Sequence, residues 1–126
     1  MTDKLDIVGI GNAMVDAIIP SNKDEVEKNN LNRDSMNLID EDLKNSLHNN
    51  YSIKEMAGGG SLGNSMFGIT SFGGNGSFIG KIKNDEVGIF LQKDMVREGL
   101  QFPLGFTSPD ISTGCCTIFV EDDGTR

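Results

Sequence analysis

Two side chains near the start of the chain are suited to binding a polar small molecule. Asn12 and Asp16 follow residues 5–11, which have the apolar pattern of a buried strand closed by glycine. Ligands of open α/β sheets bind at the carboxyl ends of strands, where a carboxylate accepts from two hydroxyls and an amide donates or accepts. The pair therefore suits a vicinal diol, and the alternative is a simple Asn–Asp turn. A binding role is favoured because Asp16 lies among apolar neighbours, where an unpartnered charge is costly.

The second polar stretch is the glycine-rich segment 57–65, which has glycine at four of the six positions 58–63. Glycine allows close approach of the backbone to a ligand and tolerates positive φ. Apolar residues then recur at helical spacing, with Ser61 placed to cap the helix. A helix that begins at such a loop directs free N–H groups and the positive end of its dipole at an oxygen-rich or anionic molecule.

Two nucleotide-binding motifs fit this segment incompletely. Gly58-x-Gly60-x-x-Gly63 matches the dinucleotide fingerprint, with Asp85 placed to bind a ribose hydroxyl, yet the preceding segment is charged where a buried strand would be apolar. The same glycines resemble a P-loop, but Asn64 replaces the lysine that binds phosphate. A purely structural alternative is that the glycines permit close packing of helix on sheet.

Composition excludes several classes of function. The 126 residues carry a net charge of −8 with no cluster of Lys or Arg, so no nucleic-acid partner is expected. The amino end leads into only a short apolar run over residues 7–10, which predicts neither a signal peptide nor a membrane span, so no membrane partner is expected. The lone His48 suggests a solvated or capping role, and with the adjacent Cys115 and Cys116 it makes neither a metal site nor a disulfide framework. A reducing, cytoplasmic location is the expectation.

Helical and strand patterns alternate along the chain, which predicts an α/β fold built from βαβ units. Strands are predicted near residues 5–11, 35–39, 52–56, 77–82 and 112–120, with extended chain over 12–19. Helices are predicted over 25–30, 41–48 with Asp40 as cap, after the glycine loop, and over 87–99, where Gly99 ends a helix with Val87, Phe90, Leu91, Met95 and Val96 on one face.

The last residues read as an interrupted hairpin. A strand pattern runs into Asp123-Gly124, a strong turn signal, and only Thr125 and Arg126 follow. We therefore expect the chain to be a carboxyl-terminally truncated piece of a longer protein.

Four motifs in this order resemble the ribokinase-like (PfkB) family of carbohydrate and nucleoside kinases. Residues 6–16 resemble the family's first strand, with the Asn-x-x-x-Asp spacing of the adenosine-kinase-like branch. Residues 59–65 resemble the Gly-Gly-x-x-x-Asn signature, residues 78–88 the strand and Asp-x-x-Gly turn after it, and residues 112–120 the Thr-Gly-x-x strand on the substrate side. The similarity covers nearly the whole chain.

The resemblance implies a mostly parallel sheet flanked by helices with a small β lid, incomplete in this fragment. Residues 1–126 would form the amino-terminal, substrate-binding part of the kinase domain, with lid or lid-base strands near 35–39 and 112–120. In this family the lid can mediate dimerisation, so a homodimer through the lid is one expectation.

The resemblance also assigns residues to a substrate site. Asn12 and Asp16 would hold sugar hydroxyls, and Gly59, Gly60 and Asn64 would complete the pocket, so the loop would bind the acceptor rather than ATP. The catalytic aspartate and the ATP site belong to the family's carboxyl half, which implies no catalytic residue and no metal site here. The whole protein would use ATP and Mg²⁺.

The sequence thus predicts the acceptor-binding half of a kinase that transfers the γ-phosphate of ATP to a hydroxyl of a sugar or nucleoside, the fragment alone being inactive. The Asn12 to Asp16 spacing and the segment 31–39 favour a nucleoside. Two alternatives stay open, a dinucleotide-binding module that uses the loop from Gly58 to Gly63 and a non-catalytic carbohydrate-binding protein. Gly58, an extra glycine, and Gly63 depart from the family pattern.

Overall fold

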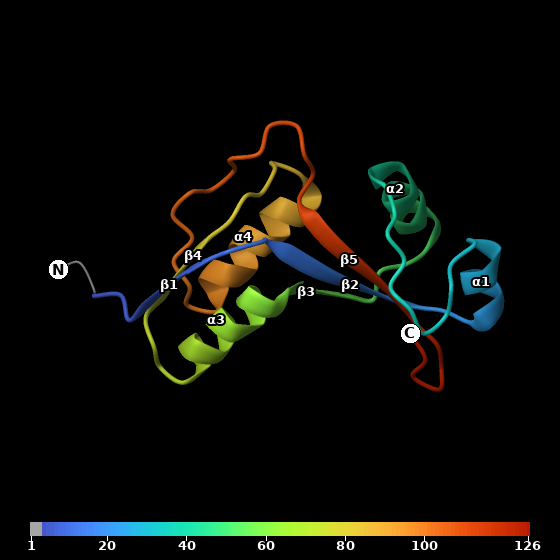
Figure 1. Ribbon diagram of the computed structural model, residues 1–126, viewed down its shortest axis with the longest axis horizontal. Coiled ribbons are helices and arrows are strands. Elements are labelled where there is room, and N and C mark those ends of the chain that lie inside the picture. Colours follow the sequence, from blue (N-terminus) through green and yellow to red (C-terminus); the bar gives the residue numbers. More distant parts are fainter. Residues whose placement is uncertain (1–3) are drawn as a thin grey trace. The chain divides into compact units, whose positions relative to one another are not determined.

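The computed structural model describes residues 4–126 and has the α/β composition that the alternating patterns predict. In chain order the elements are β1 (Ile7–Ile10), β2 (Met14–Pro20), α1 (Lys23–Lys28), α2 (Glu41–Asn50), β3 (Glu55–Gly59), α3 (Ser61–Ser71), β4 (Gly76–Ile79), α4 (Glu86–Arg97) and β5 (Gly114–Val120) (Figure 1).

The strands form two sheets. β1 and β4 pair in parallel, with Ile7 opposite Gly76 and Ile10 opposite Ile79. β3, β2 and β5 form a second sheet in that order. The chain divides into two compact units, and the division passes through β2, β3 and β5: the first unit holds residues up to Asp16 with Ala57–Cys115, and the second holds Ala17–Met56 with Cys116–Arg126.

The first unit has its core between the parallel pair and two helices. α3 contacts both β1 and β4 (Figure 1). Phe78 of β4 is fully buried and stacks on Phe102, with ring centroids 6.1 Å apart. The other buried apolar side chains of this unit are Ala13, Val15, Met66, Ile82, Val87, Leu91, Met95 and Leu100.

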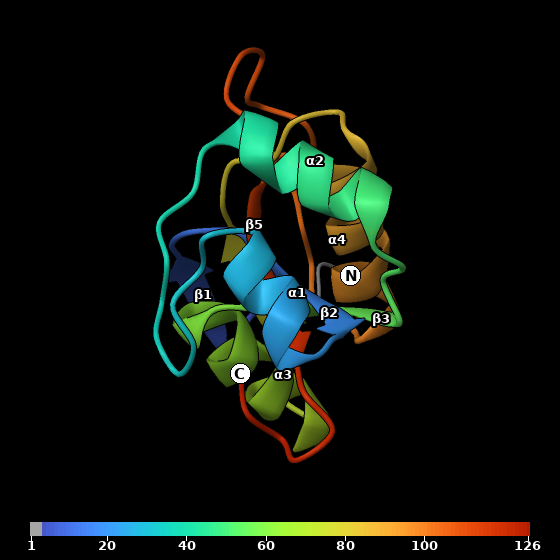
Figure 2. The ribbon, with the colours of Figure 1, turned by 90° about the vertical axis from the view of Figure 1, so that its right-hand side faces the viewer.

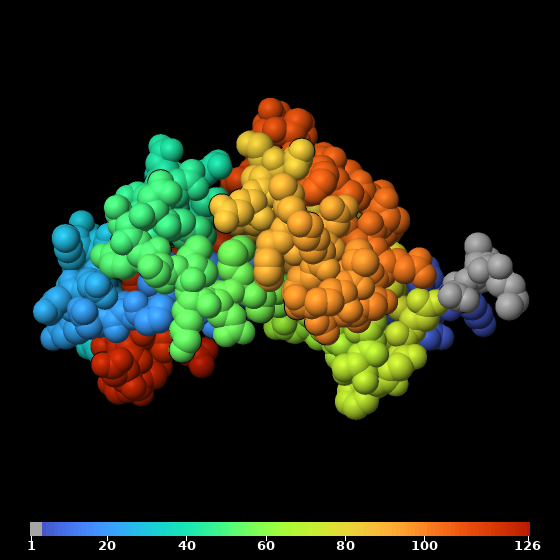
Figure 3. All heavy atoms as spheres, turned by 180° about the vertical axis from the view of Figure 1, so that it is seen from behind, coloured from blue at the N-terminus to red at the C-terminus, as the bar shows by residue number. Residues whose placement is uncertain are grey.

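α4 is amphipathic as predicted, with one exception. Gly99, at a φ of 85°, follows the end of the helix, so the predicted end is confirmed. Asp85, which the dinucleotide alternative placed on a ribose hydroxyl, caps the first turn. Val96, predicted for the buried face, is 60% exposed because it lies one position past Met95, which takes that place in the core. The outward side of α4, orange in Figure 3, is part of the molecular surface.

The second unit contains α1 and α2, and the cap that the sequence predicts for α2, Asp40, is confirmed. Asn22 and Glu25 form a capping box at α1, and the Asp40 carboxylate accepts from Leu43 N–H at α2. The core brings together Ile19, Val26, Leu47 and Phe119, with Leu31, Ile39, Leu43, Tyr51 and Ile53 around them. The Tyr51 ring meets Phe119 edge to face, 5.2 Å between centroids, which joins the end of α2 to β5.

The predicted strand over residues 35–39 is wrong. Figure 2 shows the segment between α1 and α2 as a trace without a strand arrow, and Met36 and Leu38 are 85% and 90% exposed. The Asn37 side chain folds the segment back by accepting from Asn32 N–H and donating to the carbonyl oxygens of Asn32 and Ser35. These local bonds replace the ladder that a strand needs. The strand predicted over 112–120 is confirmed as β5. The strand predicted over 52–56 begins three residues further along the chain, as β3.

A bidentate ion pair closes the second unit near the chain end. Arg33 donates from Nε to Glu121 Oε1 at 2.6 Å and from Nη2 to Oε2 at 2.7 Å. These bonds raise the pKa of the Arg33 guanidinium above its usual value. The backbone N–H of Asp34 also donates to the carbonyl of Arg126 at 2.8 Å. Both contacts hold the segment after α1 against the residues after β5.

Across residues 4–126, no helix is long and apolar enough to cross a membrane.

Candidate functional site

Asp16 of β2 lies against Gly59 of β3. Burial alternates along β2, so Val15 and Ala17 are fully buried while Asp16 is on the half-buried face. A Cβ added to Gly59 would lie 2.5 Å from Asp16 Oδ2 and 2.7 Å from Oδ1. No hydrogen bond or ion pair joins this carboxylate to another residue in the range 4–126. The structure thus presents an acceptor-rich carboxylate that can bind hydroxyl groups of a ligand.

Asn12 and Gly60 come together through the backbone. Gly11 N–H donates to the Ile79 carbonyl at 3.0 Å, which continues the β1–β4 ladder to the residue before Asn12. Asn12 is exposed directly after this point. A Cβ on Gly60 would lie 3.2 Å from Met14 Cβ and 3.8 Å from the Asn12 carbonyl oxygen. The segment from Asn12 to Asp16 therefore contacts both Gly59 and Gly60.

The amino end of α3 differs from the expectation in its capping residue. Gly60, not Ser61, is the N-cap, and no side chain bonds to the N–H groups of the first turn. Gly60 has a φ of 78°, which L-residues rarely adopt, so the glycine is needed at this turn. The hydroxyl of Ser61 lies one position too late to cap, because a cap must precede the first helical residue. The first-turn N–H groups are left to a ligand or water.

Asn64 is one helical turn beyond Gly60. Its backbone N–H donates to the Gly60 carbonyl at 2.9 Å, so this residue is fixed to the loop by the first bond of α3. The side chain is exposed and makes no hydrogen bond to other residues between 4 and 126. The five predicted binding residues thus all belong to the first unit, with direct contact shown for Asp16 with Gly59.

Behind the glycines lies a buried carboxylate that the sequence does not indicate. Asp94 of α4 is 5% exposed, and its Oδ2 accepts from the backbone N–H of Gly58 at 2.8 Å. Arg97 donates to the other carboxylate oxygen from the helix surface. The only sequence signal is an acidic residue inside an otherwise apolar helix face, and its partner is 36 positions away.

Asp85, which the dinucleotide alternative placed on a ribose hydroxyl, is bonded to other residues of the chain. Asp85 accepts from Gly88 N–H at 2.7 Å, from Thr113 N–H at 3.0 Å and from Thr113 Oγ1 at 2.8 Å. These bonds cap α4 and fasten the segment before β5, which favours a structural role for Asp85. Gly58 and Gly59 also belong to β3 rather than to an open loop, so fewer backbone N–H groups are free for a pyrophosphate.

Solved structures of sugar and nucleoside kinases are similar to this chain. An adenosine kinase from Sinorhizobium meliloti has a TM-score of 0.79 and 32% identity, over 97% of this chain and 38% of that one. A probable sugar kinase from Rhizobium etli CFN 42 has a TM-score of 0.76 and 30% identity, over 97% and 37%. The fold is ribokinase-like.

The ribokinase-like fold extends to an adenosine kinase from Anopheles gambiae, solved in complex with P1,P4-di(adenosine-5) tetraphosphate. Its TM-score is 0.77 at 24% identity, over 95% of this chain and 38% of that one. No protein-family model matches the sequence, and no curated protein matches it either. The chain spans somewhat more than a third of the length of the kinases it matches. The resemblance to ribokinase-like kinases, drawn from the four motifs, is confirmed.

Within this ribokinase-like chain, His48 lies in the last turn of α2 and makes a side-chain contact that the sequence does not indicate. Its ring is half-buried in the second unit, and Nε2 lies 2.8 Å from Thr117 Oγ1 of β5. Cys115 is half-buried and Cys116 is exposed. Residues 4–126 contain no group of three His, Cys, Asp or Glu side chains that could hold a metal ion.

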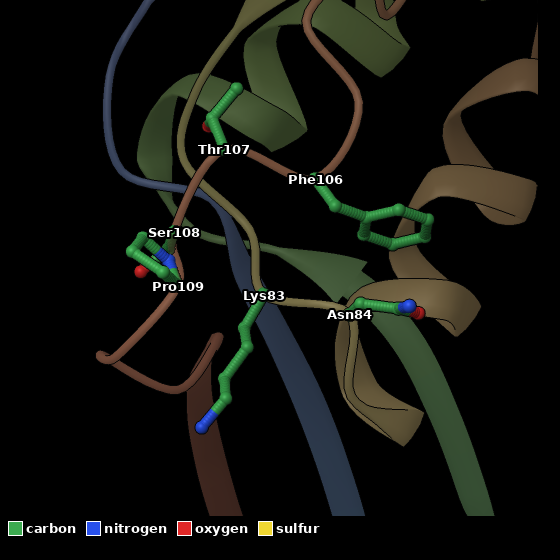
Figure 4. A pocket seen from close by; sticks show the side chains of 6 residues that line it. All are labelled: Lys83, Asn84, Phe106, Thr107, Ser108 and Pro109. Atoms are coloured by element: carbon green, nitrogen blue, oxygen red, sulfur yellow. The ribbon is translucent and has the colours of Figure 1, made fainter.

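A cavity of about 550 Å³ opens elsewhere in the first unit (Figure 4). Its lining residues are Lys83, Asn84, Phe106, Thr107, Ser108 and Pro109. In Figure 4 the Asn84 side chain and the Phe106 ring extend to the same side, whereas the Lys83 side chain runs away from them. The backbone N–H groups of Thr107 and Ser108 both donate to the Ile82 carbonyl, which joins the two segments. None of the five predicted binding residues lines this cavity.

Proposed function

We propose that this chain is the acceptor-binding part of a ribokinase-like kinase that phosphorylates a hydroxyl of a sugar or nucleoside with ATP. The observation that carries the proposal is the Asp16 carboxylate, half-buried, without a protein partner between residues 4 and 126, and held against the bare Cα of Gly59. A charge in such a place is costly unless a ligand completes its hydrogen bonds. Vicinal hydroxyl groups do so, because each donates to one carboxylate oxygen.

Each residue of the site has a defined task in this proposal. Asp16 accepts from two neighbouring hydroxyls and so fixes the orientation of the sugar ring. Asn12 and Asn64 add amide groups that bind hydroxyl or ring oxygens. Gly59 allows the Asp16 carboxylate to lie next to the backbone, and Gly60 adopts the positive φ from which α3 begins. Phosphoryl transfer depends mainly on positioning and charge stabilisation, and this chain supplies the positioning of the acceptor.

ATP and Mg²⁺ are proposed cofactors of the whole protein. The residues described here do not fit their site, since the glycine segment has Asn64 in place of a phosphate-binding lysine and no cluster of acidic side chains is poised to hold a metal. We assign no step through these cofactors to residues 4–126. ATP and Mg²⁺ would supply the transferred phosphoryl group and neutralise its charge.

A nucleoside is the favoured acceptor. The Asn12 to Asp16 spacing supports it, and two of the similar structures are adenosine kinases. We further propose a cytoplasmic location, in keeping with a cysteine content of only two adjacent residues, Cys115 and Cys116. A lid based on β5, with a homodimer through it, also remains a proposal.

Titration calorimetry tests the proposal against its alternatives. Adenosine, ribose and NADH are titrated separately into the 126-residue chain, with Asp16→Asn as the matched variant. We expect adenosine or ribose to bind, and the variant to bind more weakly, because an amide offers one acceptor oxygen where the carboxylate offers two. Tight binding of NADH alone would instead support the dinucleotide module. A full-length protein that binds ribosides yet phosphorylates none of them would be a non-catalytic carbohydrate-binding protein.

A further inference from the structure

Asp94 contacts the last residues of β3 from the side opposite to Asp16. A Cβ on Gly58 would lie 2.7 Å from Phe67 Cζ and 2.9 Å from Asp94 Oδ2, whereas a Cβ on Gly59 would meet Asp16. Consecutive residues of a strand project to opposite faces of the sheet. Gly58 and Gly59, the last two residues of β3, therefore lie between two carboxylates, one on each face of the strand.

The two carboxylates differ in their partners. Asp94 is buried and fully engaged, since Gly58 N–H donates to one oxygen and the Arg97 guanidinium to the other. Asp16 is half-buried and bonded to no residue between 4 and 126. A buried carboxylate with charged and backbone donors is a fixed anchor, because breaking either bond leaves a buried polar group unsatisfied. An open carboxylate is suited to a ligand.

Gly58 makes this anchor possible. Any side chain at position 58 would occupy the space that the Asp94 carboxylate and the Phe67 ring fill. Gly58, the glycine that departs from the family signature, is thus also the residue whose N–H donates to the Asp94 carboxylate. This coincidence gives the extra glycine a physical reason that the sequence pattern lacks.

We propose that Asp94 is a positioning residue for the acceptor site: it holds Gly58, and through the strand it sets Gly59 and Gly60 against Asp16. The inference rests on the proposed function, because it assigns to Asp94 the fixed position of the glycines in the proposed acceptor site. Asp94 itself does not contact the ligand. Its effect passes through one backbone hydrogen bond to the residue next to Gly59.

Two variants at position 94 separate the anchor from simple stability. Asp94→Asn keeps an acceptor oxygen for Gly58 N–H, and Asp94→Leu has a similar size but no acceptor. The control is Asp85→Ala, which removes the side-chain cap of α4 in the same unit, since the Asp85 carboxylate accepts from Gly88 and Thr113. Amide hydrogen exchange of Gly58, Gly59 and Gly60 by NMR, adenosine affinity by calorimetry and the melting temperature are measured for each.

We expect Asp94→Leu to speed exchange at the three glycines and to weaken adenosine binding about tenfold, the equivalent of one charge-assisted hydrogen bond. Asp94→Asn should keep glycine exchange and adenosine affinity close to those of the wild type. Asp85→Ala should lower the melting temperature while it leaves glycine exchange and adenosine affinity unchanged. If Asp94→Leu does not fold, Gly58→Ala gives the same test, because the added methyl group displaces the Asp94 carboxylate.

The outcomes also separate this inference from the proposed function. Unchanged glycine exchange and affinity in Asp94→Leu or Gly58→Ala would overturn the positioning role, whatever the chain binds. A wild-type chain that binds neither adenosine nor ribose, while Asp94→Leu still speeds glycine exchange, would overturn the proposed function and leave the anchor in place.

Discussion

Oδ2 of Asp16 lies 2.5 Å from the point that a Cβ on Gly59 would occupy. The two residues are 43 positions apart in sequence and lie on neighbouring strands, β2 and β3. Only glycine allows the carboxylate to lie this close to the backbone at position 59. The contact joins two of the four motifs on which the family resemblance rests.

Replacement of Gly59 by alanine is expected to disrupt both folding and binding. The methyl group collides with the Asp16 carboxylate, and overpacking of this kind costs about 1–3 kcal/mol of unfolding free energy. Urea denaturation measures that loss, and calorimetry with adenosine should show weakened binding beyond it. A Gly59→Ala protein that keeps wild-type affinity would show that the Asp16–Gly59 contact has no part in the site.

Asp16→Ala should separate binding from stability. Loss of two hydrogen bonds to a charged acceptor is expected to weaken adenosine affinity by at least about a hundredfold. The melting temperature should stay unchanged or rise, since the variant removes a half-buried carboxylate that bonds no residue between 4 and 126. Calorimetry and thermal unfolding test the two halves, and unchanged affinity would contradict the proposed site.

Gly63 offers a matched position within the same glycine segment. It lies in α3, and a Cβ there would meet nothing within 4 Å. Gly63→Ala is therefore expected to raise the unfolding free energy by about 0.5–1 kcal/mol, because alanine loses less backbone entropy in a helix. Adenosine affinity should not change. A loss of stability on urea denaturation would mean that position 63 needs its glycine for a reason outside helix propensity.

The turn after β5 predicts a pH effect on stability. The backbone N–H of Thr125 donates to the Asp123 carboxylate at 2.9 Å, and this bond holds the pKa of that carboxyl below its usual range. A carboxyl whose pKa is lowered on folding stabilises the protein above its unfolded pKa and loses that effect as pH falls through the folded value. Melting curves of wild type and Asp123→Ala should therefore differ at neutral pH and converge below about pH 4. Curves that stay parallel down to pH 2 would count against the bond.

The 126-residue chain alone is expected to transfer no phosphate. With ATP, Mg²⁺ and adenosine or ribose present, ADP release should stay at the rate of the blank, because residues 4–126 contain no lysine-bearing phosphate loop and no metal-binding cluster. A coupled assay for ADP measures this. ADP formation that depends on the acceptor and disappears in Asp16→Ala would show that residues 1–126 carry a catalytic centre.

Much of the fold could be read from local signals. Asp40 and Asp85 precede their helices by one position and cap them through residues three positions on, and Gly99 follows the last helical turn. Such features depend on neighbours within one turn, so their residue types alone indicate them. The segment over 35–39 failed as a strand because its alternating pattern has no pairing partner and Asn37 bonds its own loop instead.

By itself, the sequence determined the α/β order, the cap of α2, the four motifs and hence the ribokinase-like resemblance with Asn12, Asp16, Gly59, Gly60 and Asn64 as candidates. Tertiary structure alone decided which residues contact one another. Asp16 lies against Gly59, Asp94 accepts from Gly58 N–H, and Asp85 accepts from Thr113 N–H. These contacts join residues 28 to 43 positions apart. Their partners are set by the pairing of strands and the packing of α4, which no short sequence window contains.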